Sequence, residues 1–311
     1  MGLYLPEALA SEMYPFFRDV REQGMGGAAV AVVDDDTALF LNPAGLGKIR
    51  GPSLTLLNPE VESNYDTFSA LSTGGNLGNA TSAQGLLTMG VQNPNKHIHS
   101  MVEVLPSFAT TNFAVAGYAK YASDGQYNPS TQLFHLDYFN DDGAALGYCF
   151  RLLSGRLKIG VTGKVINRVY ISKDIPASST GLTIPSLASE GDGVGWDGGV
   201  LIAAPWAWLP TIGVVAHDIG NTYFTMGNGI FYRPGTIPPP QTQSVDAAVA
   251  VFPILSNTTR SSFTVEFRNI QNPQTQNINL NIHGGGRNRF CRSIFHSWWV
   301  QRRVLHGRSR V

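Results

Sequence analysis

The feature that most constrains the fold is a regular alternation of apolar and polar side chains over residues 156–170. Successive side chains of a β-strand point to opposite faces, so every second residue shares a face. One face would carry Leu157, Ile159, Val161, Val165 and Val169. The opposite face would carry Lys158, Thr162, Lys164 and Arg168. The segment therefore predicts a strand with one apolar and one charged face.

Strand-and-turn texture recurs along most of the chain and predicts about ten to eleven strands. The candidates are residues 53–62, 101–110, 112–122, 132–140, 143–153, 156–172, 196–204, 208–217, 244–252, 261–269 and 277–283. Gly155 and the cluster Asn140-Asp141-Asp142-Gly143 are hairpin-turn signals. We expect loops at 65–82, 175–195 and 223–243, and brief helices around 14–22 and 83–89. Long strands with short turns are typical of an up-and-down barrel.

Composition favours a barrel but leaves a soluble sandwich open. Charged residues make up 14% of the 311 residues and the net charge is zero, so no electrostatic footprint for nucleic acid is present. No apolar run reaches the ~20 residues of a membrane helix, whereas barrel strands need only ~9–11. The apolar face of 156–170 would meet lipid in a barrel and form the core in a sandwich. Trp206 and Trp208, at a predicted turn, fit an interfacial girdle or a soluble rim equally well.

The N-terminal part holds the most unusual stretch, residues 23–50. A small-residue run containing Gly24, Gly26 and Gly27 precedes a short apolar segment, three adjacent aspartates (34–36) and the turn Asn42-Pro43-Ala44-Gly45-Leu46. Glycines let backbone pack closely against backbone, and Pro43 biases Asn42 towards extended geometry. These properties suit a segment threaded through a confined space.

This stretch resembles the N-terminal segment of the FadL-type outer-membrane long-chain fatty-acid transporters, with looser PorV/PorQ-like and TraF-like relatives. The residues that carry the resemblance are Gly24-Met25-Gly26-Gly27-Ala28, Ala31, Asp35, Ala38 and Asn42-Pro43-Ala44-Gly45-Leu46. The remainder, to about His283, shares only the general texture. The resemblance implies an all-β, antiparallel transmembrane barrel with an N-terminal plug, or hatch, whose motif residues are Gly24, Gly26, Gly27, Asp35, Asn42, Pro43, Ala44 and Gly45. Ligand-binding residues cannot be carried over.

The implied function is passive transport of hydrophobic compounds, such as long-chain fatty acids, across the bacterial outer membrane, with membrane lipid as a partner. One alternative is an outer-membrane barrel that assists a secretion system. The other is a soluble secreted β-sandwich that binds ligands. Residues 1–7 lack the basic and apolar regions of a secretory signal. Either the sequence is the mature form, or its start was assigned too late, or the barrel interpretation is wrong.

Motifs for chemistry are weak. No nucleophile elbow, phosphate loop or Cys–His pattern is found, so we expect no enzyme and no cofactor. Asp34, Asp35 and Asp36 are expected to cap or to form salt bridges, and Asp197 and Asp246 to face the lumen. We expect His97 and His99 to be surface histidines rather than a metal pair. The run Gly191–Gly195 is expected to be a loop, and Cys149 and Cys291 indicate no disulfide framework.

The predicted organisation is a lead-in and plug (1–50), barrel strands (51–283) and an anomalous basic tail (284–311). The tail has seven arginines and no acidic residue. A basic tail can bind nucleic acid or anionic lipid. A frameshift explains it better, because degenerate codons allow the plus-one frame to read VGAEIGFADLFFIRGGFNEGYYTAGVE, a strand–turn–strand pattern. On this hypothesis the barrel is incomplete at its C-terminus.

Overall fold

A computed structural model describes residues 17, 19–72, 82–94, 96–225, 230–232, 236–255, 259–271, 281–290 and 295–300. The helices are α1 (Val20–Gly24), α2 (Ala38–Leu41), η1 (Pro43–Lys48, 3₁₀), α3 (Tyr65–Ser72), α4 (Ala83–Gln92), η3 (Leu153–Gly155, 3₁₀) and α5 (Ile184–Leu187). The strands are β1 (Ser53–Thr55), β2 (Pro59–Ser63), β3 (His97–Val104), β4 (Ser107–Thr110), β5 (Phe113–Asn128), β6 (Leu133–Leu152), β7 (Leu157–Pro176), β8 (Ser189–Ala203), β9 (Thr211–His217), β10 (Phe224–Thr225), β11 (Ser244–Val251), β12 (Thr259–Phe267), β13 (Ile282–Phe290) and β14 (Phe295–Val300).

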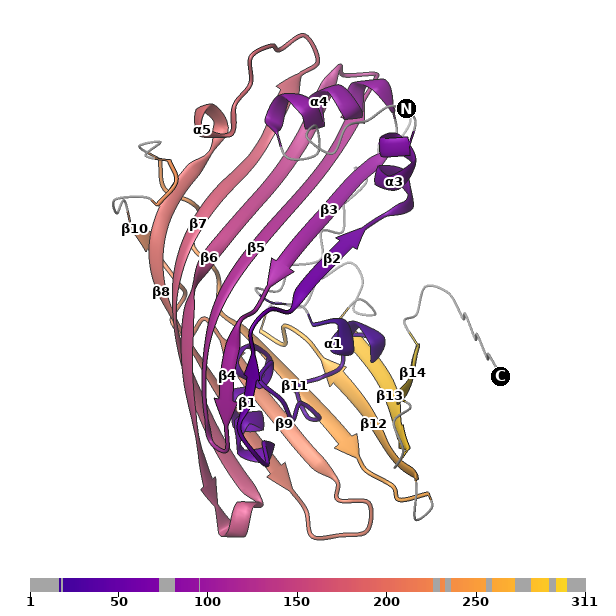
Figure 1. Cartoon of the computed structure of the whole chain (residues 1–311), viewed down its shortest axis with the longest axis vertical. Helices are drawn as coiled ribbons and strands as arrows, with labels where there is room; N and C mark the ends of the chain where they lie inside the picture. The colour runs from indigo at the N-terminus through magenta and orange to yellow at the C-terminus, as the bar shows by residue number, and fades with distance from the viewer. Residues whose placement is uncertain are drawn as a thin grey trace, which may run out of the picture.

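All strands belong to one antiparallel sheet that curls around the N-terminal segment (Figure 1). Its hydrogen-bonded order is β1-β4-β5-β6-β7-β8-β9-β11-β12-β13-β14, with β2 and β3 continuing β1 and β4. The longest ladder joins β6 to β7 without a break, from Leu133–Pro176 to Leu152–Leu157. Within the described ranges, no pair joins β1 or β2 to β14, so hydrogen bonds do not close the ring.

The polarity of the curved sheet is the reverse of that in a water-soluble domain. On its convex face large apolar side chains are exposed, among them Phe150, Val165, Trp196, Val249 and Val265, each between 52% and 60%. On its concave face, charged side chains such as Lys164, Asp197 and Glu266 are at most 2% exposed. Soluble antiparallel sheets put the apolar face inside. A transmembrane β-barrel does the opposite, so the barrel expectation is confirmed and the sandwich alternative is wrong.

The predicted hairpin at residues 140–143 is wrong, because β6 runs through it as a single strand of 20 residues. Asp141 lies on the concave face, where both carboxylate oxygens accept hydrogen bonds from Arg168 at 2.7 Å. Gly143 pairs with Ile166, and a methyl group on it would lie 2.9 Å from the Tyr118 ring. Asp141 and Gly143, whose residue types usually mark a turn, here line the inside of a wall. The turn predicted at Gly155 is confirmed, with φ at +81°.

Other boundaries also differ from expectation. The loop predicted at 65–82 contains α3, whose first turn is capped by the Asn64 side chain accepting from the Thr67 amide at 2.9 Å. The loop predicted at 175–195 shrinks, because β7 extends to Pro176 and β8 begins at Ser189, so the run Gly191–Gly195 is strand. The predicted helix at 83–89 is confirmed and extends to Gln92.

Three helices mark the upper end of the sheet in Figure 1, opposite the short β6–β7 turn. Phe134 and Leu136 share the convex face with Leu146 and Phe150, because the ladder is unbroken. Yet they are fully buried in a cluster with Leu86, Leu87 and Met89 of α4. The bare apolar band on β6 therefore covers only the lower part of the strand, about nine residues, which is the length a membrane strand needs.

The basic tail contributes two strands to the sheet. β13 pairs with β12 from Ile282–Phe267 to Phe290–Thr259, and β14 pairs with β13. Residues 291–294, including Cys291, and 301–311 lie outside the described residues, as do 1–16 and 18 of the lead-in. α1 covers the end of the helix predicted around 14–22. No described helix is both long and apolar enough to cross a membrane. The frameshift hypothesis stays a prediction.

Candidate functional site: the inner segment and its wall

Residues 25–49, which we term the inner segment, lie inside the curve of the sheet (Figure 1). Nearly all are buried, and Ala28, Ala31, Leu39, Asn42, Ala44 and Leu46 have no exposed area. η1 packs against β6, β7 and β8. The concave side of the sheet is thus filled by the chain's own N-terminal part.

The turn at Asn42 is held against the wall through two glycines that have no side chain in the way. Methyl groups built on Gly160 and Gly199 would lie 2.1 Å from the Pro43 carbonyl carbon and 2.0 Å from Asn42 Oδ1. Asn42 Nδ2 donates to the Val30 carbonyl at 2.9 Å, and its Oδ1 accepts from the Ala44 amide at 3.1 Å. The side chain therefore closes the turn and ties it to the preceding stretch. A methyl on Gly45 would likewise lie 2.6 Å from Val33.

The glycines at the start of the inner segment bring its main chain to β12 and β13. Gly24 ends α1, and Gly26 and Gly27 have positive φ of 66° and 82°, a conformation that glycine adopts at little cost. His283 Nδ1 lies 3.0 Å from the Gly26 carbonyl, and Arg268 donates to the Gly27 carbonyl. A side chain on Gly27 would meet His283.

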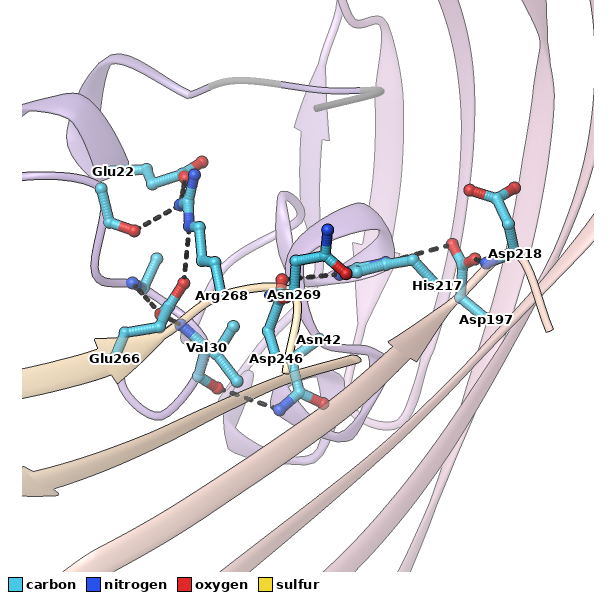
Figure 2. Close-up of polar contacts among 12 residues, drawn as sticks. Glu22, Val30, Asn42, Asp197, His217, Asp218, Asp246, Glu266, Arg268 and Asn269 are labelled. Atoms are coloured by element: carbon cyan, nitrogen blue, oxygen red, sulfur yellow. Dashed lines mark hydrogen bonds and ion pairs between the residues drawn. The ribbon is translucent and has the colours of Figure 1, made fainter. Parts of the chain in front are cut away.

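The Glu266 carboxylate binds the main chain of the inner segment directly (Figure 2). Its Oε2 accepts from the amides of Ala29 at 2.9 Å and Val30 at 2.8 Å, and its Oε1 accepts from Arg268 Nε at 2.9 Å. Arg268 also pairs with Glu22 of α1. The predicted strand 261–269 puts Glu266 and Arg268 on one face, because they are two residues apart. No sequence pattern indicated that they bind residues more than 200 positions away.

The three adjacent aspartates cap and form salt bridges, as expected. Arg21 pairs with Asp34 at 2.5 Å and with Asp35. Asp35 Oδ1 also accepts from the Thr37 amide at 3.2 Å, just before α2. Asp36 accepts hydrogen bonds from Thr55 at 3.0 Å and from Ser107. Asp34 and Asp35 share Arg21, whereas Asp36 binds the hydroxyls of Thr55 and Ser107, so the three carboxylates do not converge on one point.

A chain of buried charges lines the wall beside the inner segment (Figure 2). Lys164 Nζ lies 2.9 Å from Asp197 and 3.0 Å from Asp218. His217 lies 3.8 Å from Asp197 and 3.7 Å from Asp246. Asp197 and Asp246 therefore face the concave side, as predicted. Lys164 and Asp218 form an ion pair that the positions of these residues in the sequence did not predict.

Aromatic side chains gather around α2. Phe40 stacks on Phe17 with ring centroids 5.2 Å apart and meets the Tyr118 ring edge-on at 5.5 Å. The Arg168 guanidinium lies 5.0 Å from the centre of the Phe224 ring. All four rings belong to the same buried cluster. The concave side thus has an aromatic region next to a charged one.

The two histidines, His97 and His99, both interact with Asp124. His99 Nδ1 lies 2.8 Å from Asp124 Oδ1, and His97 Nε2 lies 3.4 Å from the same oxygen. His97 is half exposed, as expected of a surface histidine, whereas His99 is mostly buried, so the surface expectation is wrong for His99. Throughout the described chain, no group of three or more histidine, cysteine or acidic side chains could hold a metal ion. Cys149 is a buried free thiol.

A groove lies in the wall where β11, β12 and β13 meet. Its volume is about 380 Å³. Lining residues are Val249, Ala250, Val251, Phe263, Thr264, Val265, Gly284 and Gly285. Behind it, a methyl on Gly285 would lie 2.0 Å from the Met25 carbonyl oxygen of the inner segment. A single layer of backbone therefore separates the groove from the inner segment at this point.

Together these features define a class of protein: an antiparallel barrel-like sheet, apolar outside and charged inside, filled by its own N-terminal segment. No protein-family model matches the chain, and no curated protein matches it by sequence.

Among solved structures, the chain is similar to the CymD monoaromatic hydrocarbon channel, with 10% identity, a TM-score of 0.41, and coverage of 90% of this chain and 74% of that one. It is also similar to the toluene transporter TodX of P. putida, with 11% identity, a TM-score of 0.39, and coverage of 86% and 87%.

Proposed function

We propose that this protein is a bacterial outer-membrane channel for passive uptake of uncharged hydrophobic small molecules, with residues 1–50 as lead-in and plug and residues 51–283, continued by β13 and β14, as barrel wall. The observation that carries the proposal is the reversed polarity of the sheet. A bare apolar band faces outwards, and the N-terminal segment, held by apolar packing and by polar contacts to the wall, fills the inside. A sheet of this polarity is stable only where its convex face meets hydrocarbon.

The orientation follows from the connections. Bacterial barrels have short periplasmic turns and longer extracellular loops. The end with η3 has short turns, and the opposite end carries α3, α4 and α5 (Figure 1). Trp206 and Trp208, 72% and 64% exposed, lie at the short-turn end, where an aromatic girdle would meet the headgroups.

The chemistry of the concave side favours an uncharged cargo. A fatty-acid carboxylate would need a cation, but Arg168 is engaged by Asp141, and Lys164 by Asp197 and Asp218. The aromatic side chains around Phe40 are at most 7% exposed, so an apolar ligand would reach them only when the inner segment moves. Burial of apolar area stabilises a bound ligand by roughly 25 cal/mol per Å². Two cations of the concave side are thus already paired, and uncharged compounds are the cargo class that we test first.

The proposed mechanism is passive. A ligand partitions from the extracellular end towards the aromatic cluster, and a shift of the plug around Asn42-Pro43-Ala44 opens a path through the wall. The close approach of this turn to Gly160 and Gly199 makes the seated plug a tight fit. A small displacement of the turn would then relieve contacts on both strands at once.

The test is uptake into proteoliposomes. Radiolabelled toluene and hexadecanoate are compared with empty liposomes, using the parent protein, Phe40→Ala and the control Gly117→Ala. Gly117 lies in β5, where a methyl would meet its nearest neighbour at an ordinary 3.6 Å. We expect protein-dependent toluene uptake that Phe40→Ala lowers and Gly117→Ala leaves unchanged. Uptake of hexadecanoate alone would reverse the proposed cargo class, and uptake of neither would contradict transport and favour the secretion-partner alternative.

A further inference from the structure

The curved sheet has a seam between its first and last strands. Among the described residues, β2 pairs only with β3, and β14 only with β13. α1 lies in this region, between β2 and the β13–β14 pair (Figure 1). A short helix, rather than a ladder of strand hydrogen bonds, therefore occupies the seam.

One side of α1 is bonded to the first edge of the sheet. The Val20 amide donates to Glu60 Oε1 of β2 at 3.4 Å. The carboxyl groups of Asp19 and Glu60 lie near each other, and a charge on Glu60 raises the cost of charging Asp19. Both are largely buried, at 8% and 7% exposed. Asp19 in turn caps α1 by accepting from the Glu22 amide at 3.3 Å.

The other side of α1 is bonded to the last strands. Glu22, only 2% exposed, pairs with Arg268, which follows β12 by one residue. Arg268 and His283 of β13 bind the carbonyls of Gly27 and Gly26, just after α1. α1 also lies against β14. One turn and a half of helix thus touches both margins of the sheet.

The contacts of α1 with the two margins differ from the backbone hydrogen bonds that join neighbouring strands elsewhere in the wall. They are side-chain contacts, so they can be lost one at a time, whereas a ladder between strands is lost cooperatively. Glu22 Oε2 and Glu60 Oε2 are buried and make no hydrogen bond of their own. A buried carboxylate oxygen without a partner leaves the attachment less stable than a fully bonded one. The seam is therefore the part of the described wall best suited to open.

We propose that α1 is a clasp across this seam, which couples β2 to β12–β13 so that the two margins part when α1 lets go. The inference rests on the proposed function, in which an open seam would give an apolar compound a sideways route from the bore into lipid. The measurable part of the proposal is the coupling between the β2 margin and the β12–β13 margin. Weakening α1 at one margin must loosen the other margin as well, because coupling between two sites is reciprocal.

Hydrogen exchange measured by mass spectrometry on the full chain in detergent micelles tests the coupling. The variants are Glu22→Gln, which weakens the attachment to Arg268, and Glu60→Gln, which puts a weaker, uncharged acceptor opposite the Val20 amide. The matched control is Glu190→Gln, a carboxylate of β8 that is 3% exposed and binds Asn167 at 3.1 Å, away from α1.

We expect Glu22→Gln to speed exchange in β2 by about fivefold or more, and Glu60→Gln to do the same in β13. Glu190→Gln should change neither. Faster exchange only at the margin that carries the substitution would overturn the clasp. If either variant does not fold, Asp19→Ala, which removes the acceptor that caps α1, takes its place with the same expectation at β13. Exchange needs no cargo, so this result is independent of toluene uptake.

Discussion

At the scale of single residues, the inner segment is held by main-chain contacts that side chains of the wall provide. Glu266 accepts from two consecutive amides, and Arg268 and His283 engage two carbonyls. Small residues in the segment make this approach possible. The identity of the glycines therefore matters more than the identity of the apolar residues between them.

Gly160→Ala tests the closest approach. Its methyl group would lie 2.1 Å from the Pro43 carbonyl carbon, so either the turn or β7 must shift. We expect a loss of about 1–3 kcal/mol in the free energy of unfolding, typical of overpacking. Unfolding is followed in detergent by urea titration. Gly117→Ala serves as the control, and equal stability of the two variants would contradict the seating of Pro43 against Gly160.

Asp19 predicts a pH dependence of stability. Burial, then the nearby carboxylates of Asp35 and Glu60, raise the pKa of Asp19 from 3.8 to about 7. The folded state then binds more protons than the unfolded state between these values, so this contribution to stability is complete below pH 3.8 and is lost as the pH rises through 7.

Asp19→Asn should remove this loss while keeping the helix cap. We expect the variant to melt a few degrees above the parent at pH 8 and close to it at pH 4. Thermal melts followed by circular dichroism at both pH values check the prediction. A variant that is less stable at pH 8 would show that the carboxylate is stabilising there.

At the scale of elements, the alternation of side chains predicted most strands and their faces, because a strand that separates lipid from charge must alternate strictly. The alternation could not predict where strands end.

Residues 140–143 have the composition of a turn, yet Asp141 binds Arg168, which lies on the following strand, β7. α3 was missed because its apolar face is short, although Asn64 provided a cap signal. The position of residues 23–50 inside the sheet was expected from the family resemblance. Neither the alternation nor the resemblance predicted that Glu266, Arg268 and His283 bind this segment.

The packing of α4 on the convex face is a testable feature of this scale. A methyl group on Gly90 would lie 2.3 Å from the Phe134 ring, and a methyl on Gly125 of β5 would lie 2.4 Å from the same ring. Gly90→Ala should therefore loosen α4, despite the better helix propensity of alanine. We expect faster trypsin cleavage near Lys96 and a loss of about 1–3 kcal/mol.

A second substitution provides the control. Phe134→Leu makes room at the same contact, so the double variant Gly90→Ala/Phe134→Leu should recover part of the protection that Gly90→Ala loses. If cleavage is equally fast in the double variant, α4 is not seated on the Phe134 ring.

At the scale of the whole molecule, we expect the lipid-facing apolar band to end partway along a strand, so that one face of the strand passes from lipid into water. Val165 and Lys173 share the convex face of β7, since they are an even number of residues apart in an unbroken ladder. Val165 is 52% exposed and apolar, whereas Lys173 lies at the end that carries the helices.

Spin labels at Val165→Cys and Lys173→Cys, each read in lipid bilayers, measure this boundary. We expect the label at 165 to collide mainly with oxygen dissolved in lipid and the label at 173 mainly with a water-soluble nickel chelate. Cys291 is replaced by serine in both variants, and buried Cys149 is left in place as the unlabelled background. Equal exposure of both labels to water would contradict a membrane-embedded sheet.

The covered upper part of β5, β6 and β7 has a consequence at the cell surface. If the bare band lies in lipid, the part of the wall that carries α4 projects well above it, roofed by a helix and backed by charged strands. Such a projection presents antibodies and phages with a rigid, folded epitope rather than a mobile loop, and substitutions there can change recognition from outside without touching the bore.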